Sequence, residues 1–301
     1  MEPARRGLVV PLVLGTSVVF AGIAYPVTGA ALGLTSPALI ATTRALAGGL
    51  VMLPVLRLAG ARLPATRGGW AWAVAIGAGN ITLTLGAIAA GTQLAGAAVA
   101  SVLLNSAPFF AAMLARTLLD ERLTHLRVAG LVVGFGGIVV IVATEPSSGG
   151  GTHVAEGAAV CLLGALGWAA AGLGMRFLSV REARFDVLGA TTAQFLCGGV
   201  LLIPYLVATD GAHADWSEPK LWASLIFLVI GAQVITYVGF YLALARWTSA
   251  RVFAWTFLVP AVAVVIEALE GNLPSTLTTV GLVVVIAGVG MVTHPGADIT
   301  A

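Results

Sequence analysis

The sequence predicts an all-α integral membrane protein with ten transmembrane helices, arranged as two inverted five-helix repeats. Composition, the spacing of apolar segments and the distribution of cations predict this fold. Of the 301 residues, 59% are hydrophobic and 9% are charged. A soluble domain of that composition would expose too much apolar surface to water. In a bilayer, spanning segments must be helices because no water is present to satisfy backbone groups.

Ten apolar segments follow one another along the chain, each close to the roughly 20 residues that cross a hydrocarbon core. They are Leu8–Ala30, Pro37–Leu56, Trp70–Ala90, Leu94–Leu114, Val128–Thr144, Gly157–Phe177, Val187–Ala208, Leu221–Leu244, Val252–Leu269 and Leu277–Val292. Short connections join them. We therefore expect no soluble catalytic or nucleotide-binding domain.

Positive charge alternates between the two ends of these segments. Cationic residues favour the cytoplasmic ends of membrane helices. Of the 15 Lys and Arg residues, 13 precede the first segment or occupy every second connection: Arg5, Arg6, Arg57, Arg62, Arg67, Arg116, Arg122, Arg127, Arg176, Arg181, Arg184, Arg246 and Arg251. The other connections hold only Lys220. This pattern predicts a plasma-membrane protein with both termini in the cytoplasm, and it explains the cations without nucleic acid.

The chain also carries an internal repeat. Ala41–Gly49, followed by Pro54, matches Thr191–Gly199, followed by Pro204. Further matches pair Leu104–Pro108 with Thr256–Pro260 and Gly130–Val133 with Gly281–Val284. We therefore expect a first five-helix repeat over 1–147 and a second over 148–301. An odd number of helices per repeat inverts the second copy, and inverted repeats are typical of secondary transporters.

Three sequence motifs resemble a known family. They are Ala41-Thr42-Thr43-Arg44, the segment from Ala107 to Thr124, and the glycine-rich fifth segment. In these motifs the chain resembles the drug/metabolite transporter superfamily, in particular its ten-helix EamA-type branch. The resemblance implies export of amino acids, related metabolites or drugs without ATP hydrolysis, through a central cavity lined by both repeats. In one departure, Asp120–Thr124 corresponds to Gly271–Ser275, so Glu121 has no acidic counterpart.

Two ionisable residues stand inside predicted helices. Arg44 lies seven residues past Pro37, about 10 Å from the external helix end. Such a residue usually faces a partner or a cavity. It is a candidate carboxylate anchor, and the structural alternative is that it snorkels outward or pins neighbouring helices through backbone carbonyls. Glu267, at a comparable depth, is a candidate partner or coupling group, or an ordinary acidic residue at a helix end.

Polar and aromatic residues at helical spacing are candidates for the substrate pathway. The predicted substrate-binding residues are Asn80, Thr84, Ser101, Asn105, Trp168, Gln233, Tyr237, Tyr241 and Trp255. Asn80 and Thr84 are four residues apart, so a helix would place them on one face. The two tryptophans lie at mid-membrane depth, away from the interface that tryptophan favours. Asn, Ser and Thr also join membrane helices to one another, and this structural alternative stays open.

Other residue types indicate packing and bending. Pro108 and Pro260 are candidate hinges, because proline removes a helical donor; a static bend is the alternative. The glycines of the fifth and tenth segments suggest close helix contacts. The resemblance implies a scaffold layer or a homodimer-facing layer for these helices, and contacts within the monomer are the alternative. Cys161 and Cys197 lie in apolar helices, which favours packing over a disulfide or metal site.

We therefore predict a secondary transporter with a small-molecule substrate, the bilayer as its surroundings and no cofactor. A membrane enzyme is disfavoured because the four histidines lie in connections or near the end of the chain. A channel would share the polar pathway without alternating halves. Translocation of a lipid or polyprenyl carrier, or multidrug efflux, is the alternative function.

Overall fold

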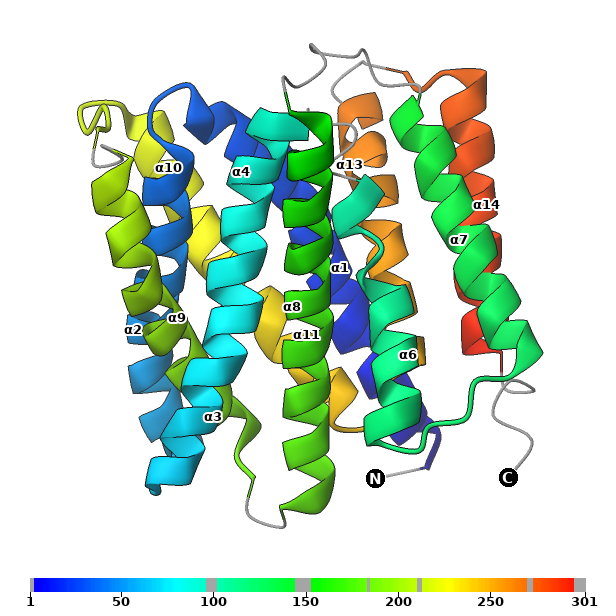
Figure 1. Ribbon diagram of the computed structural model, residues 1–301, viewed down its shortest axis with the longest axis horizontal. Helices are drawn as coiled ribbons and strands as arrows, with labels where there is room; N and C mark the ends of the chain where they lie inside the picture. Colours follow the sequence, from blue (N-terminus) through cyan, green and yellow to red (C-terminus); the bar gives the residue numbers. More distant parts are fainter. Residues whose placement is uncertain are drawn as a thin grey trace.

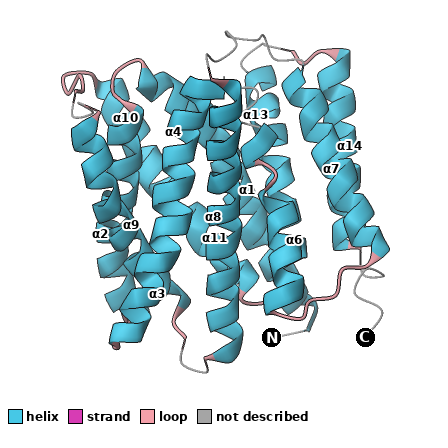
Figure 2. Ribbon diagram, viewed as in Figure 1, coloured by secondary structure: helices cyan, strands magenta, loops and turns pink. Residues whose placement is uncertain are grey.

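The computed structural model is a bundle of long helices that run side by side in alternating directions (Figure 1). It describes residues 3–95, 102–143, 153–182, 185–209, 213–269 and 273–294. The prediction of an all-helical protein is confirmed, since these residues form helices, loops and one isolated β-bridge between Thr35 and Ala214, and no strand (Figure 2). The first helix begins and the last helix ends at the same end of the bundle.

The helices have the following bounds. They are α1 (Pro3–Leu32), α2 (Pro37–Ala59), α3 (Arg67–Gly77), η1 (Ala78–Leu83), α4 (Thr84–Ala95), α6 (Ala107–Leu118), α7 (His125–Ala143), α8 (Val154–Arg181), α9 (Val187–Ala208), α10 (Pro219–Phe227), η2 (Leu228–Ile235), α11 (Thr236–Leu244), α12 (Ser249–Ala254), η3 (Trp255–Phe257), α13 (Leu258–Leu269) and α14 (Thr276–Thr293).

Most of the described helical runs match the length of a membrane crossing. Eight are long and apolar enough to span a bilayer, and Val102–Leu118 and His125–Ile141 are shorter apolar helices. The predicted fourth segment, Leu94–Leu114, has the wrong bounds. The preceding helix continues to Ala95, and a turn at residues 105–106 separates residues 102–104 from α6.

The two candidate hinge prolines lie near the start of helices. Pro108 occupies the first turn of α6, and Pro260 is the third residue of α13, directly after the 3-10 turn η3. In the first turn of a helix the missing N–H of proline leaves no intrahelical bond unmade, and this applies to Pro108, which follows the turn at residues 105–106. Pro260 lies within a helical run that is unbroken from Ser249 to Leu269 and only tightens at η3, so its missing N–H falls inside that run.

Two helices contain a widened π-helical segment in the middle of the bundle, Ala78–Leu83 in one and Leu228–Ile235 in the other. The residue that follows each segment is a threonine, Thr84 or Thr236. In both cases its hydroxyl donates to the carbonyl five residues earlier, at 3.0 Å. The Thr84 hydroxyl also lies 3.2 Å from the backbone oxygen of Gly164 in α8. The Thr236 hydroxyl lies 3.3 Å from that of Ser17 in α1. The same side-chain device therefore stabilises both wide turns.

Helices α2 and α9 pack closely along their length, and glycine makes the approach possible. A Cβ atom built on Gly49 would lie 2.6 Å from the side chain of Leu196. A Cβ atom on Gly199 would lie 2.7 Å from the side chain of Leu46. Each helix therefore inserts a leucine against a glycine of the other.

Four glycines of α7 and α14 lie at close contacts within the chain. A Cβ atom on Gly130 would lie 2.8 Å from the carbonyl oxygen of Gly288, and one on Gly137 would lie 2.8 Å from that of Gly281. Backbone contacts of this kind exclude any larger residue. Packing within one molecule accounts for these four, whereas Gly136 and Gly290 have nothing within 4 Å, and the homodimer alternative stays a prediction.

Candidate functional site

Three neutral polar side chains from different helices meet inside the bundle. The Nδ2 amide of Asn80 donates to the hydroxyl of Tyr241 at 2.9 Å and to Oε1 of Gln194 at 3.2 Å. The Tyr241 hydroxyl donates in turn to the same Oε1, at 3.1 Å. Asn80 and Gln194 are 0% exposed and Tyr241 is 1% exposed. The three form a hydrogen-bonded triangle that is shielded from solvent.

A close backbone crossing of α3 and α9 brings this triangle together. A Cβ atom on Gly77 would lie 2.6 Å from the backbone oxygen of Gln194 and 2.9 Å from the nitrogen of Gly198. One on Gly198 would lie 2.7 Å from the backbone oxygen of Gly77. Asn80, in the wide turn η1, follows Gly77 by three residues. The two glycines therefore set the distance between the Asn80 and Gln194 side chains.

A further buried amide, Gln233 on η2, shares a neighbour with Phe195, the residue after Gln194. A Cβ atom on Gly48 would lie 3.0 Å from Cγ of Gln233 and 3.6 Å from the Phe195 ring. The ring of Tyr237 stands edge-on to Phe195 at 5.6 Å and lies 6.2 Å from that of Tyr241. We call Asn80, Gln194, Gln233 and Tyr241 the amide set.

The amide set has hydrogen-bonding capacity that the described residues leave unused. Oδ1 of Asn80, Nε2 of Gln194 and both amide atoms of Gln233 are buried and have no hydrogen-bond partner within the described part of the chain. A buried polar atom without a partner costs about 1–3 kcal/mol. A bound molecule that supplied partners would recover that free energy.

Aromatic side chains border the amide set on one side. The Trp168 ring lies 6.0 Å from that of Phe240, which lies 5.8 Å from that of Tyr241. Trp255 packs instead against Trp247, at 6.4 Å. The indole nitrogens of Trp168 and Trp255 are buried without a hydrogen-bond partner among the described residues. Two of the predicted aromatic residues thus keep a free donor.

The remaining predicted site residues have varied positions. The Thr84 hydroxyl is directed at backbone carbonyls, as described above, so its spacing from Asn80 reflects the π-helical turn. Asn105 is buried in the turn before α6. Ser101 lies outside the described residues, and so does the side chain of Glu267.

Gln194 is the functional candidate that sequence analysis missed. Thr191 is its only polar neighbour at helical spacing on α9, so Gln194 belongs to no longer polar stripe like that of Gln233, Tyr237 and Tyr241. The repeat alignment did contain a signal, because Gln194 occupies the position of Arg44 when Thr191–Gly199 is placed on Ala41–Gly49. Arg44 is half-buried on α2, four residues before Gly48 and therefore on the same helix face.

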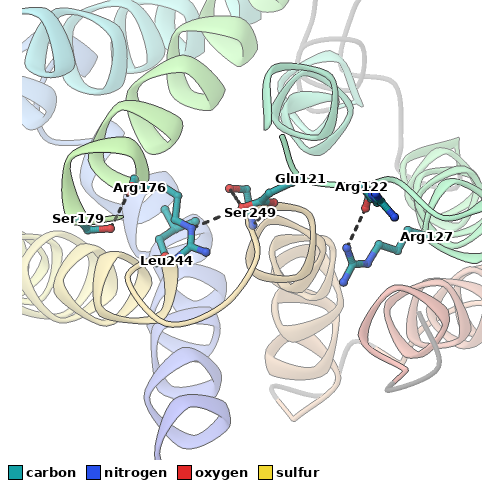
Figure 3. Close-up of polar contacts among 7 residues, drawn as sticks. All are labelled: Glu121, Arg122, Arg127, Arg176, Ser179, Leu244 and Ser249. Atoms are coloured by element: carbon teal, nitrogen blue, oxygen red, sulfur yellow. Dashed lines mark hydrogen bonds and ion pairs between the residues drawn. The ribbon is translucent and has the colours of Figure 1, made fainter. Parts of the chain in front are cut away.

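A second polar group lies at the helix ends, in the loop after α6 (Figure 3). Oε2 of Glu121 accepts the backbone N–H of Ser249 at 2.8 Å, and Oε1 accepts its hydroxyl at 3.1 Å. Oε1 also lies 3.5 Å from Nε of Arg176. Nη1 of Arg176 donates to the backbone oxygen of Leu244 at 2.8 Å. We call these four residues the Glu121 cluster.

The Glu121 cluster joins four helices at the end of the bundle that carries most of the arginines. Glu121 follows α6, Arg176 belongs to α8, Leu244 ends α11 and Ser249 begins α12. The Glu121 and Arg176 side chains are 10% and 16% exposed. Charge-assisted hydrogen bonds of this kind are shorter and stronger than neutral ones. The cluster therefore closes this end of the bundle.

Comparison with known proteins assigns the family. The model of the EamA-like transporter family matches residues 9–143 and 155–294. The chain belongs to this family. The prediction made from the resemblance is confirmed, and the multi-span helical architecture agrees with a transporter of the EamA family.

Several curated proteins resemble this EamA-family chain. It is 27% identical over 286 residues to "Uncharacterized transporter YvbV" of Bacillus subtilis, covering 93% of this chain and 90% of that protein. It is 32% identical to the "Probable terminal-alkyne amino-acid exporter" of Streptantibioticus cattleyicolor, covering 65% of this chain and 64% of that protein. The "Probable amino-acid metabolite efflux pump" of Salmonella typhimurium is 26% identical, over 64% of this chain and 66% of its own length.

A solved crystal structure shares the EamA-family fold. It superimposes with a TM-score of 0.80 at 18% sequence identity, covering 94% of this chain and 96% of that one. At this identity the likeness is evidence for the fold alone.

Proposed function

We propose that this EamA-family protein is a secondary transporter that exports small metabolites, amino acids or drugs by alternating access. The observation that carries the proposal is the amide set, a group of polar atoms with unused capacity inside helices of membrane-spanning length. Its members are 0–1% exposed, so a solute reaches them only after the bundle changes conformation. This closure favours a transporter over an open channel. The names of two relatives support amino acids as a substrate class.

The proposed mechanism uses two inverted halves, 1–147 and 148–301. Paired features support this division: each half has a π-helical segment closed by a threonine, and the Gly49–Leu196 contact has its counterpart in Gly199–Leu46. The family model also matches the chain in two parts. In such transporters one half rocks against the other around a fixed site.

In this mechanism the Glu121 cluster seals the cytoplasmic side. The arginine pattern supports a cytoplasmic location for this end of the bundle, together with both termini, in the plasma membrane. Opening the site to the cytoplasm then requires α12 to separate from the loop after α6. Release of the substrate outside takes place with the cluster intact.

The proposed site combines the amide set with Tyr237, Trp168 and Trp255, and it places Arg44 as an anchor for a carboxylate. Guanidinium binds carboxylates in a bidentate manner, and the face of α2 that carries Arg44 also carries Gly48, the contact of Gln233. Thr84, Ser101 and Asn105 are further candidates from the sequence, Glu267 is a candidate coupling group, and Pro108 and Pro260 are candidate hinges.

Counterflow in proteoliposomes tests the proposal. Purified protein is reconstituted with unlabelled amino acid inside and a labelled amino acid or an aromatic cationic drug outside. We expect saturable uptake of at least one amino acid, reduced in Trp168→Ala and Trp255→Ala. Uptake of the drug alone would make multidrug efflux the function. Linear, unsaturable flux would indicate a channel.

A lipid substrate is the second candidate, and one feature favours it. An apolar groove of about 310 Å³ opens between α1, α2, α9 and α11 and is lined by residues such as Met52, Leu188 and Val238. An acyl chain has matching chemistry. If folded protein exchanges no amino acid or drug, scrambling of a fluorescent lipid in the same liposomes becomes the decisive measurement.

A further inference from the structure

The Asn80–Gln194 pair makes one of the two hydrogen bonds that two carboxamides can share. Nδ2 of Asn80 donates to Oε1 of Gln194, while Oδ1 of Asn80 and Nε2 of Gln194 stay without partners. One acceptor and one donor therefore remain on the same pair. They complement a group that has both a donor and an acceptor, such as a hydroxyl or a carboxamide.

Gln233 repeats this property on a different helix. Both its donor and its acceptor are buried without a partner in the described residues, and the side chain is 0% exposed. It contacts Gly48 of α2 and lies one turn before Tyr237. The unused atoms thus come from three elements, η1, η2 and α9.

The amide set carries no formal charge. Its internal bonds all join neutral groups, from Asn80 to Tyr241 and Gln194. An ion placed among them would lose its hydration without gaining a counter-charge from these side chains, which is costly in a buried site. The chemistry of the amide set therefore favours an uncharged polar group.

The two related positions of the halves differ in charge. Arg44 on α2 corresponds to Gln194 on α9 in the repeat alignment. One half thus offers a guanidinium and the other a carboxamide.

The geometry points to a specificity role: we propose that the amide set recognises an uncharged hydrogen-bonding group of the substrate, and that Gln194 is a specificity-determining residue at this contact. The inference rests on the proposed transport function and adds the chemical class of the group recognised. Gln194 is held in place by Asn80 and Tyr241 and by the crossing of Gly77 and Gly198, so its free Nε2 points from a rigid support.

The test is counterflow of labelled amino acids that differ in side chain. Serine, threonine and glutamine carry an uncharged hydrogen-bonding group, glutamate and lysine carry a charge, and leucine carries neither. We expect the wild-type protein to exchange serine, threonine and glutamine about tenfold faster than it exchanges glutamate and lysine. Gln194→Leu should lower exchange of serine, threonine and glutamine about tenfold relative to leucine, since it removes the free Nε2 donor together with the Oε1 acceptor that holds Asn80 and Tyr241.

A matched variant separates recognition from packing. Thr192→Val lies on the same helix, is nearly isosteric and removes a hydroxyl that donates to the backbone oxygen of Leu188. It should keep the wild-type ranking of substrates. Gln233→Leu is the second site variant and should also weaken polar exchange, which keeps the test valid if Gln194→Leu fails to fold.

The outcomes separate the two proposals. Faster wild-type exchange of glutamate or lysine, or an unchanged ranking in folded Gln194→Leu and Gln233→Leu, would overturn the specificity inference and leave the transporter intact. Absence of exchange for every amino acid, from protein with a normal unfolding midpoint, would overturn amino-acid transport and this inference with it.

Discussion

The Glu121 cluster and the amide set are both buried and polar, yet their hydrogen bonding is opposite in character. In the cluster, charge meets opposite charge, and both carboxylate oxygens have partners. In the amide set there is no charge, and four atoms have no partner among the described residues. Nε of Arg176 has this ion pair but no hydrogen bond among the described residues, whereas the oxygens of the Glu121 carboxylate are both engaged. A carboxylate with both oxygens engaged contributes to a closed conformation, and buried amide atoms without partners are available to bind. The comparison assigns closure to one region and recognition to the other.

The substitution with the largest expected effect is Gly77→Ala, at the α3–α9 crossing that holds the amide set together. Gly77→Ala places a Cβ atom 2.6 Å from the backbone oxygen of Gln194, and backbone cannot move aside as a side chain can. We expect the free energy of unfolding to fall by about 3 kcal/mol. Unfolding in mixed micelles measures it. Gly86→Ala is the control, because nothing lies within 4 Å of that position, and its effect should stay within about 1 kcal/mol. Equal stability of the two variants would contradict the close crossing.

Glu121→Ala disrupts the Glu121 cluster. It removes both acceptors of Ser249 and leaves Arg176 without its carboxylate, so we expect a loss of about 2 kcal/mol in the same assay. Asp120→Asn is the control. Asp120 is exposed and has φ of 53°, a conformation that asparagine tolerates. If both variants unfold alike, the cluster does not stabilise this conformation.

Tyr241→Phe sharpens the comparison within the amide set. It deletes the hydroxyl that bonds to both Asn80 and Gln194, so that Nδ2 of Asn80 and Oε1 of Gln194 keep only their bond to each other. We expect a loss of about 1–2 kcal/mol in unfolding free energy together with slower counterflow. Tyr205→Phe, on α9, should have neither effect. A Tyr241→Phe protein with wild-type stability and transport would remove the triangle from the proposed site.

Ser249→Ala has the smallest expected effect. Its backbone N–H still donates to Glu121, and only the hydroxyl bond is lost, so we expect roughly 0.5–1 kcal/mol. In the double variant with Glu121→Ala the two losses should not add, because both remove the same contact. Additive losses in the unfolding assay would show that Ser249 acts independently of Glu121.

Hydropathy predicted most helices because a membrane segment is recognised by length and apolarity alone. The predicted Val187–Ala208 helix has those bounds in the structure. Leu94–Leu114 failed because the turn at Asn105 and Ser106 lies in apolar sequence and does not interrupt the hydropathy. Hydropathy could not predict the π-helical turns either, since these segments are as apolar as the helices around them.

Sequence analysis predicted the part of the candidate site whose residues recur at helical spacing. Gln233, Tyr237 and Tyr241 lie at regular helical spacing, and sequence analysis selected them. Gln194 has no such pattern, and its partners come from 114 and 47 residues away. The contacts of Glu121 with Ser249, 128 residues distant, depend in the same way on tertiary packing. Long-range polar contacts have no local signature in a single sequence.

The wide turns at Ala78–Leu83 and Leu228–Ile235 have a consequence for how this chain tolerates change in length. A π-helical turn is an α-helix with one residue inserted. Deleting that residue would restore regular winding and leave the helix beyond it in register, because the wide turn is what absorbs the extra residue. In the second segment Tyr237 and Tyr241 would keep their side of the helix, whereas a deletion in the regular part before it would turn them by about 100°. The wide turns are thus the places where these two membrane helices can lose a residue without reorienting the residues that follow.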